Sequence, residues 1–401
     1  MLKKKVIALG AIAALLLAAC GDDEDAGSDT TTGTNAPDNS TADTTGEDDG
    51  CLVGVSWFTF QEERYGLRDE PGIKNAIEAG GGEYIGNDGQ NSAETQAANV
   101  ETLINAGVDV LVIDAFDSEA IKPSVAAAQA AGIPVLAYDR LIEDESVLYL
   151  THDNVEVGRM IARQIVEEVP EGNYALIKGD QANPNSLFLE GGFHEIIDPL
   201  IDSGAITVVG DEYTDSWAPE NAQVNMEQIL TANDNDVDAV LSQNDGMAGG
   251  VIAALALQGL DGTVRVGGQD GDLAALNRVA LGTQSVSVWK DATELGTVAG
   301  QAALQLCENP DPAAVDGTTS FETPEGNTVT AILLAPIPIT QENLQVVLDA
   351  NWIDEATLCQ DVPAGSVAGC PSGVRTRSMT SGGPAYDVNR VRGAAASWSP
   401  R

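Results

Sequence analysis

The sequence predicts an α/β fold in which helices cover both faces of parallel sheets. The first observation is a series of short, almost wholly apolar segments typical of buried strands, such as residues 108–113 and 133–138. The second is that segments with helical spacing, such as 121–131 and 155–169, stand between them. The third is the length of 401 residues, which allows a large core and two domains.

The alternation of strand and helix patterns begins after residue 51. Strands are expected at 52–56, 108–113, 133–138, 174–177, 206–209, 237–242 and 264–267, and helices at 73–79, 121–131, 155–169, 187–200, 222–230 and 246–258. Near the end, a polar loop (310–327), a strand (328–335) and a helix (343–350) are expected. The residues alone fit either two doubly wound domains or one barrel.

The first fifty residues have the pattern of an export and anchoring signal. Three lysines precede an apolar run that ends at residue 19, and Leu17-Ala18-Ala19-Cys20 resembles the lipobox of bacterial lipoproteins. We expect a signal peptide at 1–19, lipidation of Cys20 and a lipid anchor at the outer face of the membrane. Residues 20–50 are polar and acidic, which predicts a disordered tether.

Charge and cysteine content narrow the function classes. The net charge of −43 excludes a general nucleic-acid binder, which needs a basic face. If Cys20 is modified, four cysteines remain for two disulfides, namely Cys51, Cys307, Cys359 and Cys370. Three pairings are open, with free thiols as the alternative. No CxxC pair occurs, so no metal site is expected.

The last thirty-odd residues differ in character from the rest of the chain. Residues 371–401 hold five arginines and one acid, without a periodic apolar pattern. We expect a disordered tail, with contact to anionic lipid as the alternative.

Polar residues follow several predicted strands, at the end where open sheets and barrels bind ligands. In the segments around these residues the chain resembles the ribose-binding type of periplasmic sugar-binding proteins of ABC importers. The resemblance is greatest to the D-xylose-binding proteins. The segments that carry the resemblance lie within residues 51–355 and are 61–64, 107–113, 136–140, 153–154, 217–222, 230–233, 244–245, 268–272 and 280–284.

The resemblance implies the type I periplasmic binding protein fold, with two Rossmann-like, doubly wound lobes joined by three crossing strands. The N-terminal lobe is then expected at 51–154 plus 291–334, and the C-terminal lobe at 155–288 plus 336–355. It also implies hinge closure on a sugar and delivery to an ABC permease with its ATPase. Nothing in the sequence indicates an obligate oligomer or a cofactor, so we expect a monomer without one.

The resemblance also implies which residues bind the sugar. The family's ligands map onto Arg64, Tyr65, Asp139, Arg140, Asn185, Trp217, Asn244, Asp270 and Lys290. Carboxylate, amide and guanidinium groups suit sugar hydroxyls, and the aromatic rings of Trp217 and Tyr65 suit its C–H faces. The loop 179–186 departs from the family pattern, so its ligand is Asn183, Asn185 or both.

Several candidates also have a simpler structural interpretation. Asn244 and Asp270 are suited to capping helices, Trp217 to a core and Arg64 to the surface. Lys290 either binds the sugar or steadies the crossing at which it stands, and residues 153–154 are expected to act at a hinge.

Other functions fit the sequence less well. No enzyme is expected, because no catalytic motif such as GxSxG, HExxH or a phosphate-binding loop is present. A sugar-responsive repressor would carry a DNA-binding segment in place of the export signal. D-xylose is the expected solute, with glucose or a broader set of aldoses as the alternative. A sugar sensor for a membrane receptor would share the same site.

Overall fold

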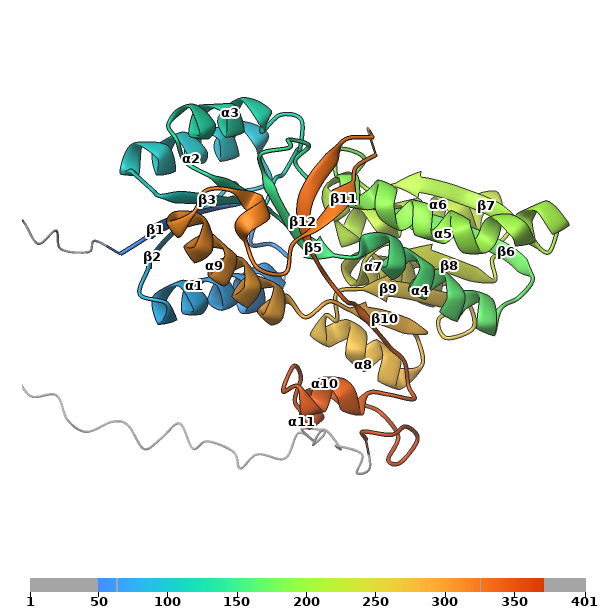
Figure 1. Cartoon of the computed structure of the whole chain (residues 1–401). Helices are drawn as coiled ribbons and strands as arrows, with labels where there is room; N and C mark the ends of the chain where they lie inside the picture. Colours follow the sequence, from blue (N-terminus) through green and yellow to red (C-terminus); the bar gives the residue numbers. More distant parts are fainter. Residues whose placement is uncertain (1–49, 63, 325, 371–401) are drawn as a thin grey trace, which may run out of the picture. The chain divides into compact units, whose positions relative to one another are not determined.

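Two separate sheets organise the described part of the chain, which comprises residues 50–62, 64–324 and 326–370 of this computed structural model (Figure 1). The expected signal peptide, Cys20, nearly all of the tether and the tail 371–401 lie outside the described residues. Within the described ranges, no helix combines the length and apolar character needed to cross a membrane.

The first sheet has seven strands, and the first five in the chain are parallel. In spatial order they are β11 (Thr319–Glu322), β12 (Thr328–Leu334), β5 (Leu148–His152), β4 (Val135–Tyr138), β3 (Val110–Ile113), β1 (Leu52–Trp57) and β2 (Glu83–Asp88). Strand β12 runs parallel to β5, and among the described strands of this sheet only β11 is antiparallel to its neighbour.

Helices cover both faces of this first sheet, and together they form lobe one. They are α1 (Glu70–Ala79), α2 (Ala93–Ala106), α3 (Lys122–Ala130) and α9 (Ala292–Glu308). Ile73, Ile77 and Leu295 bury α1 and α9 in one apolar cluster, whereas Val100 and Val125 bury α2 and α3 in another. Because both faces are covered, strands β3 and β4 are apolar throughout.

The second sheet has six strands. In spatial order they are β13 (Ile337–Ile339), β10 (Val286–Trp289), β9 (Arg265–Gln269), β8 (Ala239–Ser242), β6 (Gly172–Lys178) and β7 (Ile206–Tyr213). The edge strand β13 is antiparallel to β10, and the other pairs are parallel.

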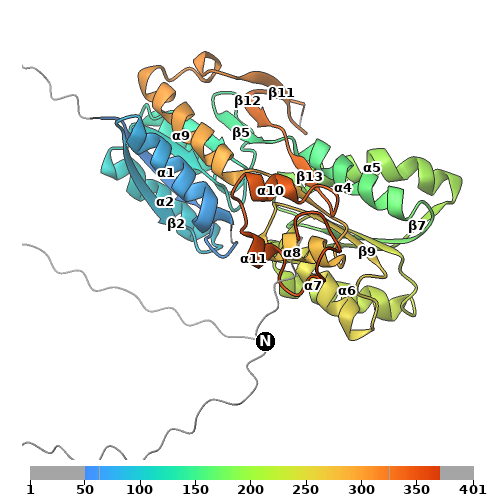
Figure 2. The same ribbon diagram turned by 90° about the horizontal axis from the view of Figure 1, so that it is seen from below.

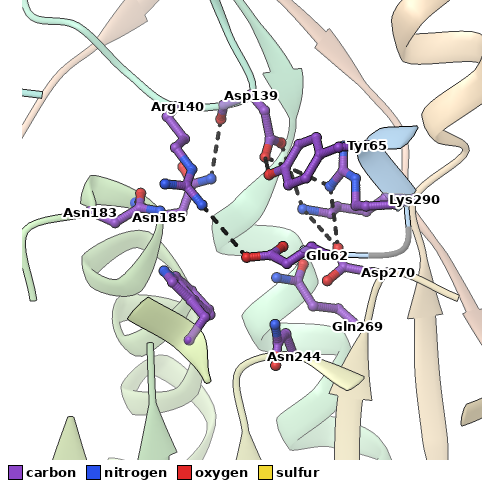
Figure 3. A pocket seen from close by; sticks show the side chains of 12 residues that line it. Glu62, Tyr65, Asp139, Arg140, Asn183, Asn185, Asn244, Gln269, Asp270 and Lys290 are labelled. Carbon is purple, nitrogen blue, oxygen red and sulfur yellow. Dashed lines mark hydrogen bonds and ion pairs between the residues drawn. The ribbon is translucent and has the colours of Figure 1, made fainter. Parts of the chain in front are cut away.

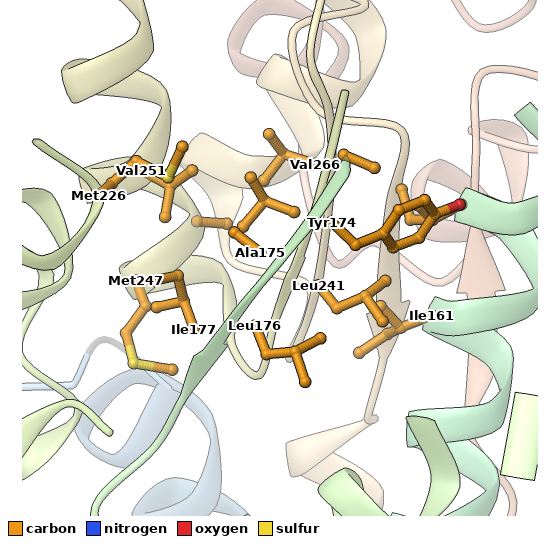
Figure 4. Packing of buried hydrophobic residues seen from close by; sticks show 14 of the residues in the cluster. Ile161, Tyr174, Ala175, Leu176, Ile177, Met226, Leu241, Met247, Val251 and Val266 are labelled. Atoms are coloured by element: carbon orange, nitrogen blue, oxygen red, sulfur yellow. The ribbon is translucent and has the colours of Figure 1, made fainter. Parts of the chain in front are cut away.

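Helices also cover both faces of the second sheet, and together they form lobe two. They are α4 (Asn154–Glu168), α5 (Pro184–Ser203), α6 (Pro219–Ala232), α7 (Asp245–Leu257), α8 (Leu273–Leu281), α10 (Gln345–Asp349) and α11 (Glu355–Leu358). Figure 4 shows Ile161 of α4 on one side of strand β6, with Met226 and Val251 of α6 and α7 on the other.

The chain passes between the lobes three times, after β5, after β10 and between β12 and β13. This confirms the two-lobed, doubly wound α/β fold with three crossings, and it decides against the barrel that the residues alone had left open. Asp153 at the first crossing caps α4, since its side chain accepts a hydrogen bond from the Glu156 backbone amide.

The structure also holds elements that the apolar pattern did not indicate. Strand β2 is a partly exposed edge strand and therefore lacks a buried apolar run. The expected polar loop 310–327 is wrong in part, because Thr319–Glu322 pair with β12 as strand β11. Backbone pairing stabilises such edge strands without requiring buried side chains.

Two disulfides select one of the three open pairings. Cys51–Cys307 joins the start of β1 to the end of α9 across 256 residues of sequence. Cys359–Cys370 closes a short loop after α11, and both of its cysteines are fully buried. The structure therefore excludes the free-thiol alternative for these four cysteines.

Candidate ligand-binding site between the lobes

A cavity lies where the two lobes meet, and mainly polar side chains surround it (Figure 3). It is lined by Glu62, Arg64, Tyr65, Asp139, Arg140, Asn183, Asn185, Trp217, Asn244, Gln269, Asp270 and Lys290. The structure thus brings together all nine residues singled out in the sequence. Glu62 and Gln269 were missed as lining residues, although they lie within the segments 61–64 and 268–272 that carried the resemblance.

The topology explains why residues so far apart in sequence converge here. In parallel sheets the carboxyl ends of the strands lie at one edge, where the connecting segments form a crevice. Asp139 follows β4 in lobe one, Asn244 follows β8 in lobe two and Asp270 follows β9. Lys290 follows β10 and so stands at the second crossing between the lobes.

Arg64 and Asp270 join the two lobes across the cavity. The guanidinium of Arg64 donates two hydrogen bonds to Asp69 in its own lobe, at 2.7 and 3.1 Å. Its remaining nitrogen lies 3.3 Å from the Asp270 carboxylate, and the Lys290 ammonium lies 3.2 Å from the same oxygen. Both cations are almost fully buried, so the carboxylates offset a desolvation penalty of several kcal/mol per ion.

Asp139 is the second carboxylate of this network. The Tyr65 hydroxyl donates to it at 3.1 Å, while Lys290 and Arg64 each lie 3.7 Å away. Burial opposes its ionisation, but the attraction of Lys290, Arg64 and Arg140 outweighs burial and lowers the pKa of Asp139 below its ordinary range. Asp139 therefore stays an anion and an acceptor at neutral pH.

Contacts on the side away from the cavity fix the guanidinium plane of Arg140. It donates to the Ala115 carbonyl at 3.2 Å and lies 3.5 Å from the buried Asp114 carboxylate. Its guanidinium carbon sits 3.5 Å from the centre of the Phe58 ring. Towards the cavity it faces Glu62 at 3.9 Å, and burial raises the pKa of Glu62 to about 7, although Arg140 opposes that shift.

Three asparagines approach the cavity from lobe two. The Asn183 side chain caps α5 by accepting from the Asn185 amide at 3.0 Å, and Asn244 caps α7 by accepting from the Met247 amide at 2.8 Å. The capping interpretation of Asn244 therefore holds together with its place at the cavity. The side-chain amide of Asn185 donates across the lobe boundary to the backbone carbonyl of Asp139 at 3.1 Å.

Trp217 lies in the short turn Asp215–Trp217 and is only 6% exposed. Its indole packs directly against Gly179, where an added Cβ would come within 2.2 Å of the ring. The absence of a side chain at Gly179 thus lets the indole lie against this backbone and line the cavity.

Five buried polar atoms of the lining have no hydrogen-bond partner among the described residues. Arg140 Nε faces the Asp114 carboxylate at 3.5 Å, and the other four are Asp139 Oδ1, Asn185 Oδ1, Gln269 Oε1 and Trp217 Nε1. Leaving such an atom unpaired costs about 1–3 kcal/mol, and native proteins rarely do so without a reason. Three acceptors and one donor around one cavity suit a ligand that both donates and accepts hydrogen bonds.

Two open sheets with a polar cavity at their crossing define a two-lobed solute-binding fold. The profile of the periplasmic binding protein domain matches residues 53–311. The chain belongs to the periplasmic binding protein family.

Individual relatives match most of the chain. The D-xylose-binding periplasmic protein of Escherichia coli (strain K12) is 39% identical over 294 residues, which cover 73% of this chain and 88% of that protein. The multiple sugar-binding periplasmic receptor ChvE of Rhizobium radiobacter is 30% identical and covers 74% and 88%. An ABC transporter solute-binding protein of Clostridium phytofermentans, solved with bound β-D-glucose, superposes with a TM-score of 0.69 at 28% identity, covering 77% and 99%.

Proposed function

We propose that this protein is the extracytoplasmic solute-binding subunit of an ABC sugar importer and that it captures D-xylose in the cavity between its lobes. The observation that carries this proposal is that four buried polar atoms around that cavity, Asp139 Oδ1, Asn185 Oδ1, Gln269 Oε1 and Trp217 Nε1, lack a hydrogen-bond partner among the described residues. Each sugar hydroxyl donates one hydrogen bond and accepts up to two, so a monosaccharide satisfies both the three acceptors and the indole donor.

The charges of the lining favour an uncharged solute. The carboxylates of Asp139 and Asp270 line the cavity and face the cations of Arg64, Arg140 and Lys290, and Glu62, whose pKa is about 7, supplies a third acidic group beside Arg140. These groups already pair with one another, so an ionic ligand would leave a buried charge without a counter-ion. The pairing also favours a binding protein over an enzyme, because these groups are engaged with one another as partners.

D-xylose is the first choice of solute because two relatives that are 39% identical are named D-xylose-binding proteins. Glucose is the alternative, since two structural neighbours of at least 25% identity carry it. A hexose adds a CH2OH group to the pyranose of xylose and needs space for it. An epimer that leaves one buried polar group of the site without a hydrogen bond should bind more weakly by about 1–3 kcal/mol.

Capture proceeds by closure of the lobes in this proposal. Arg64 with Asp270 and Asn185 with the Asp139 carbonyl already bridge the two lobes at the cavity wall. Hinge motion at the crossings opens and closes this wall, and the closed form is presented to an ABC permease and its ATPase. Lipidation of Cys20 and the tether up to residue 50 would hold the protein at the outer face of the membrane.

Calorimetric titration of the purified protein with D-xylose, D-glucose, D-ribose and L-arabinose tests the function. We expect one-to-one binding with D-xylose the tightest, weakened in Trp217→Ala by roughly 1–3 kcal/mol through loss of the stacking face. Preference for glucose would keep the site and change the solute. No binding of any aldose by well-folded protein would contradict the proposal.

Gly179→Ala should weaken D-xylose binding without unfolding the protein. The new methyl group meets the Trp217 indole at 2.2 Å, so the indole must leave its position at the cavity. Misplacing a packed aromatic typically costs about 1–3 kcal/mol, so we expect a Kd at least several-fold higher by calorimetry. Gly191→Ala is the matched control, because no atom of the described residues outside its own helix backbone lies within 4 Å of its added Cβ. Equal affinities in both variants would show that Trp217 does not contact the sugar.

D-xylose affinity should fall as pH rises through neutrality. The pKa of Glu62 is about 7 because of burial, and a sugar in the cavity removes further water from its carboxyl. The neutral form therefore binds sugar better, and the linkage relation predicts a Kd that is higher at pH 8 than at pH 6, by at most about tenfold. Glu62→Gln should remove this dependence. An affinity that rises with pH, or an unchanged slope in the variant, would contradict the assignment to Glu62.

A further inference from the structure

The end of the described chain packs beside the cleft. Residues 351–370 carry α11 and the Cys359–Cys370 disulfide, and they are called the C-terminal clasp below. Figure 2 shows α10 and α11 beside α8 at the margin of lobe two. The Asn277 amide of α8 donates to the Leu358 and Gln360 carbonyls, both at 2.9 Å. The clasp is therefore part of lobe two and moves with it.

Trp352 of the clasp holds the loop that carries Asp270. Its indole nitrogen donates to the Gly271 carbonyl at 2.6 Å, and the amide of Gly271 donates to the buried Asp245 carboxylate at 3.0 Å. The Trp352 ring also packs on Trp289, the residue before Lys290, at 5.4 Å between centroids. Trp352 is 6% exposed, so these contacts are shielded from water. Asp270 and Lys290 line the cavity, and the clasp contacts the residue next to each of them, Gly271 and Trp289.

Arg68 of lobe one reaches across the lobe boundary to the same residue. Its guanidinium donates to the Trp352 carbonyl at 2.5 Å and lies 4.6 Å from the centre of the indole ring. Arg68 stands one turn after Arg64, whose contact with Asp270 bridges the lobes inside the cavity. The segment 64–69 therefore contacts lobe two at two points. Arg64 contacts Asp270 inside the cavity, and Arg68 contacts Trp352 outside it.

We propose that Arg68 and the C-terminal clasp form a latch that holds the two lobes closed and slows release of the sugar. The proposal rests on the proposed function for its ligand. Arg68 does not line the cavity, so it acts on lobe closure and leaves the sugar contacts intact. A charged donor and a stacked ring form only when the lobes are together, and opening breaks both. The disulfide keeps the clasp in place, because the segment has little regular structure of its own.

Stopped-flow dissociation of D-xylose from the full-length protein tests the latch. We expect Arg68→Ala to release the sugar roughly tenfold faster, with an unchanged thermal midpoint in the absence of sugar. Cys359→Ser/Cys370→Ser should also speed release, because the clasp loosens. Arg163→Ala is the control for loss of an arginine, since Arg163 forms an ion pair with Glu156 on its own helix, away from the lobe boundary. Cys51→Ser/Cys307→Ser, at the opposite end of the lobe one strands, should lower the midpoint and leave the release rate unchanged.

A second readout needs no sugar and separates the latch from the choice of ligand. X-ray scattering should give a larger radius of gyration for ligand-free Arg68→Ala than for the unaltered protein, because the open form gains population. If the unaltered protein binds D-xylose and the variant releases it at the same rate, the latch is wrong and the proposed function stands. If no aldose binds, the proposed function fails, and an equal radius of gyration in both proteins then overturns the latch as well.

Discussion

Asp270→Asn is expected to weaken D-xylose binding by about 100-fold. The Asp270 carboxylate is the shared partner of Arg64 and Lys290, both of which are buried. An amide of the same shape leaves these two cations with less compensating charge and removes an anionic acceptor from the cavity. Truncating one member of a buried charge pair costs about 2–5 kcal/mol, which corresponds to that loss of affinity.

Calorimetry on the variant measures this effect, with the thermal midpoint as the check on folding. The matched control is Asp261→Asn, which removes the same charge from an exposed turn of lobe two. We expect the control to bind as the unaltered protein does, since surface charges contribute little. Equal affinity in both variants would place the sugar away from Asp270 and would contradict the proposed site.

Removal of the Cys51–Cys307 disulfide is expected to give the largest loss of stability. The bridge closes a loop of 256 residues between the start of β1 and the end of α9. In the chain-entropy model a loop of that size stabilises the folded state by about 5–6 kcal/mol, because the crosslink restricts the unfolded chain. Cys51→Ser/Cys307→Ser should lower the thermal midpoint by roughly 10 °C in a protein of this size.

The second disulfide supplies the comparison. Cys359–Cys370 spans 11 residues, so its removal should destabilise the protein less, by about 2–3 kcal/mol. Differential scanning calorimetry of the two double variants orders the effects directly. A larger loss for the short loop would show that contacts of the C-terminal clasp, rather than chain entropy, dominate its contribution.

The alternation of strands and helices was readable from the sequence because burial on both faces leaves a continuous apolar run. Strand β3 is Val-Leu-Val-Ile and fully buried, and its apolar run appeared directly in the sequence. Strands β2 and β11 gave no such signal, since backbone pairing at an edge places few demands on side chains. The residues alone left a barrel open, because strand order is a property of the pairing and not of any single segment.

The candidate site followed from sequence only through the resemblance. Polar residues after β4, β8 and β9 marked the edge of a sheet, yet nothing in their spacing placed Asp139 and Asp270 around one cavity. Glu62 was missed as a lining residue because its significance depends on Arg140, which follows β4 and lies 3.9 Å away. The contact of Arg68 with Trp352 joins residues 284 positions apart, so no local sequence pattern predicts it.

The sequence by itself determined the α/β class, most of the helices, and most of the strands that are buried on both faces of a sheet. It also determined the acidic character of the chain. Each of these depends on local periodicity or on composition. The tertiary structure alone decided the disulfide pairing, the two-sheet topology and the meeting of Arg64, Asp139, Asp270 and Lys290 at one cavity. The physical reason is that these features are contacts between segments far apart in the chain. Their geometry is fixed by how the two sheets pack and cross.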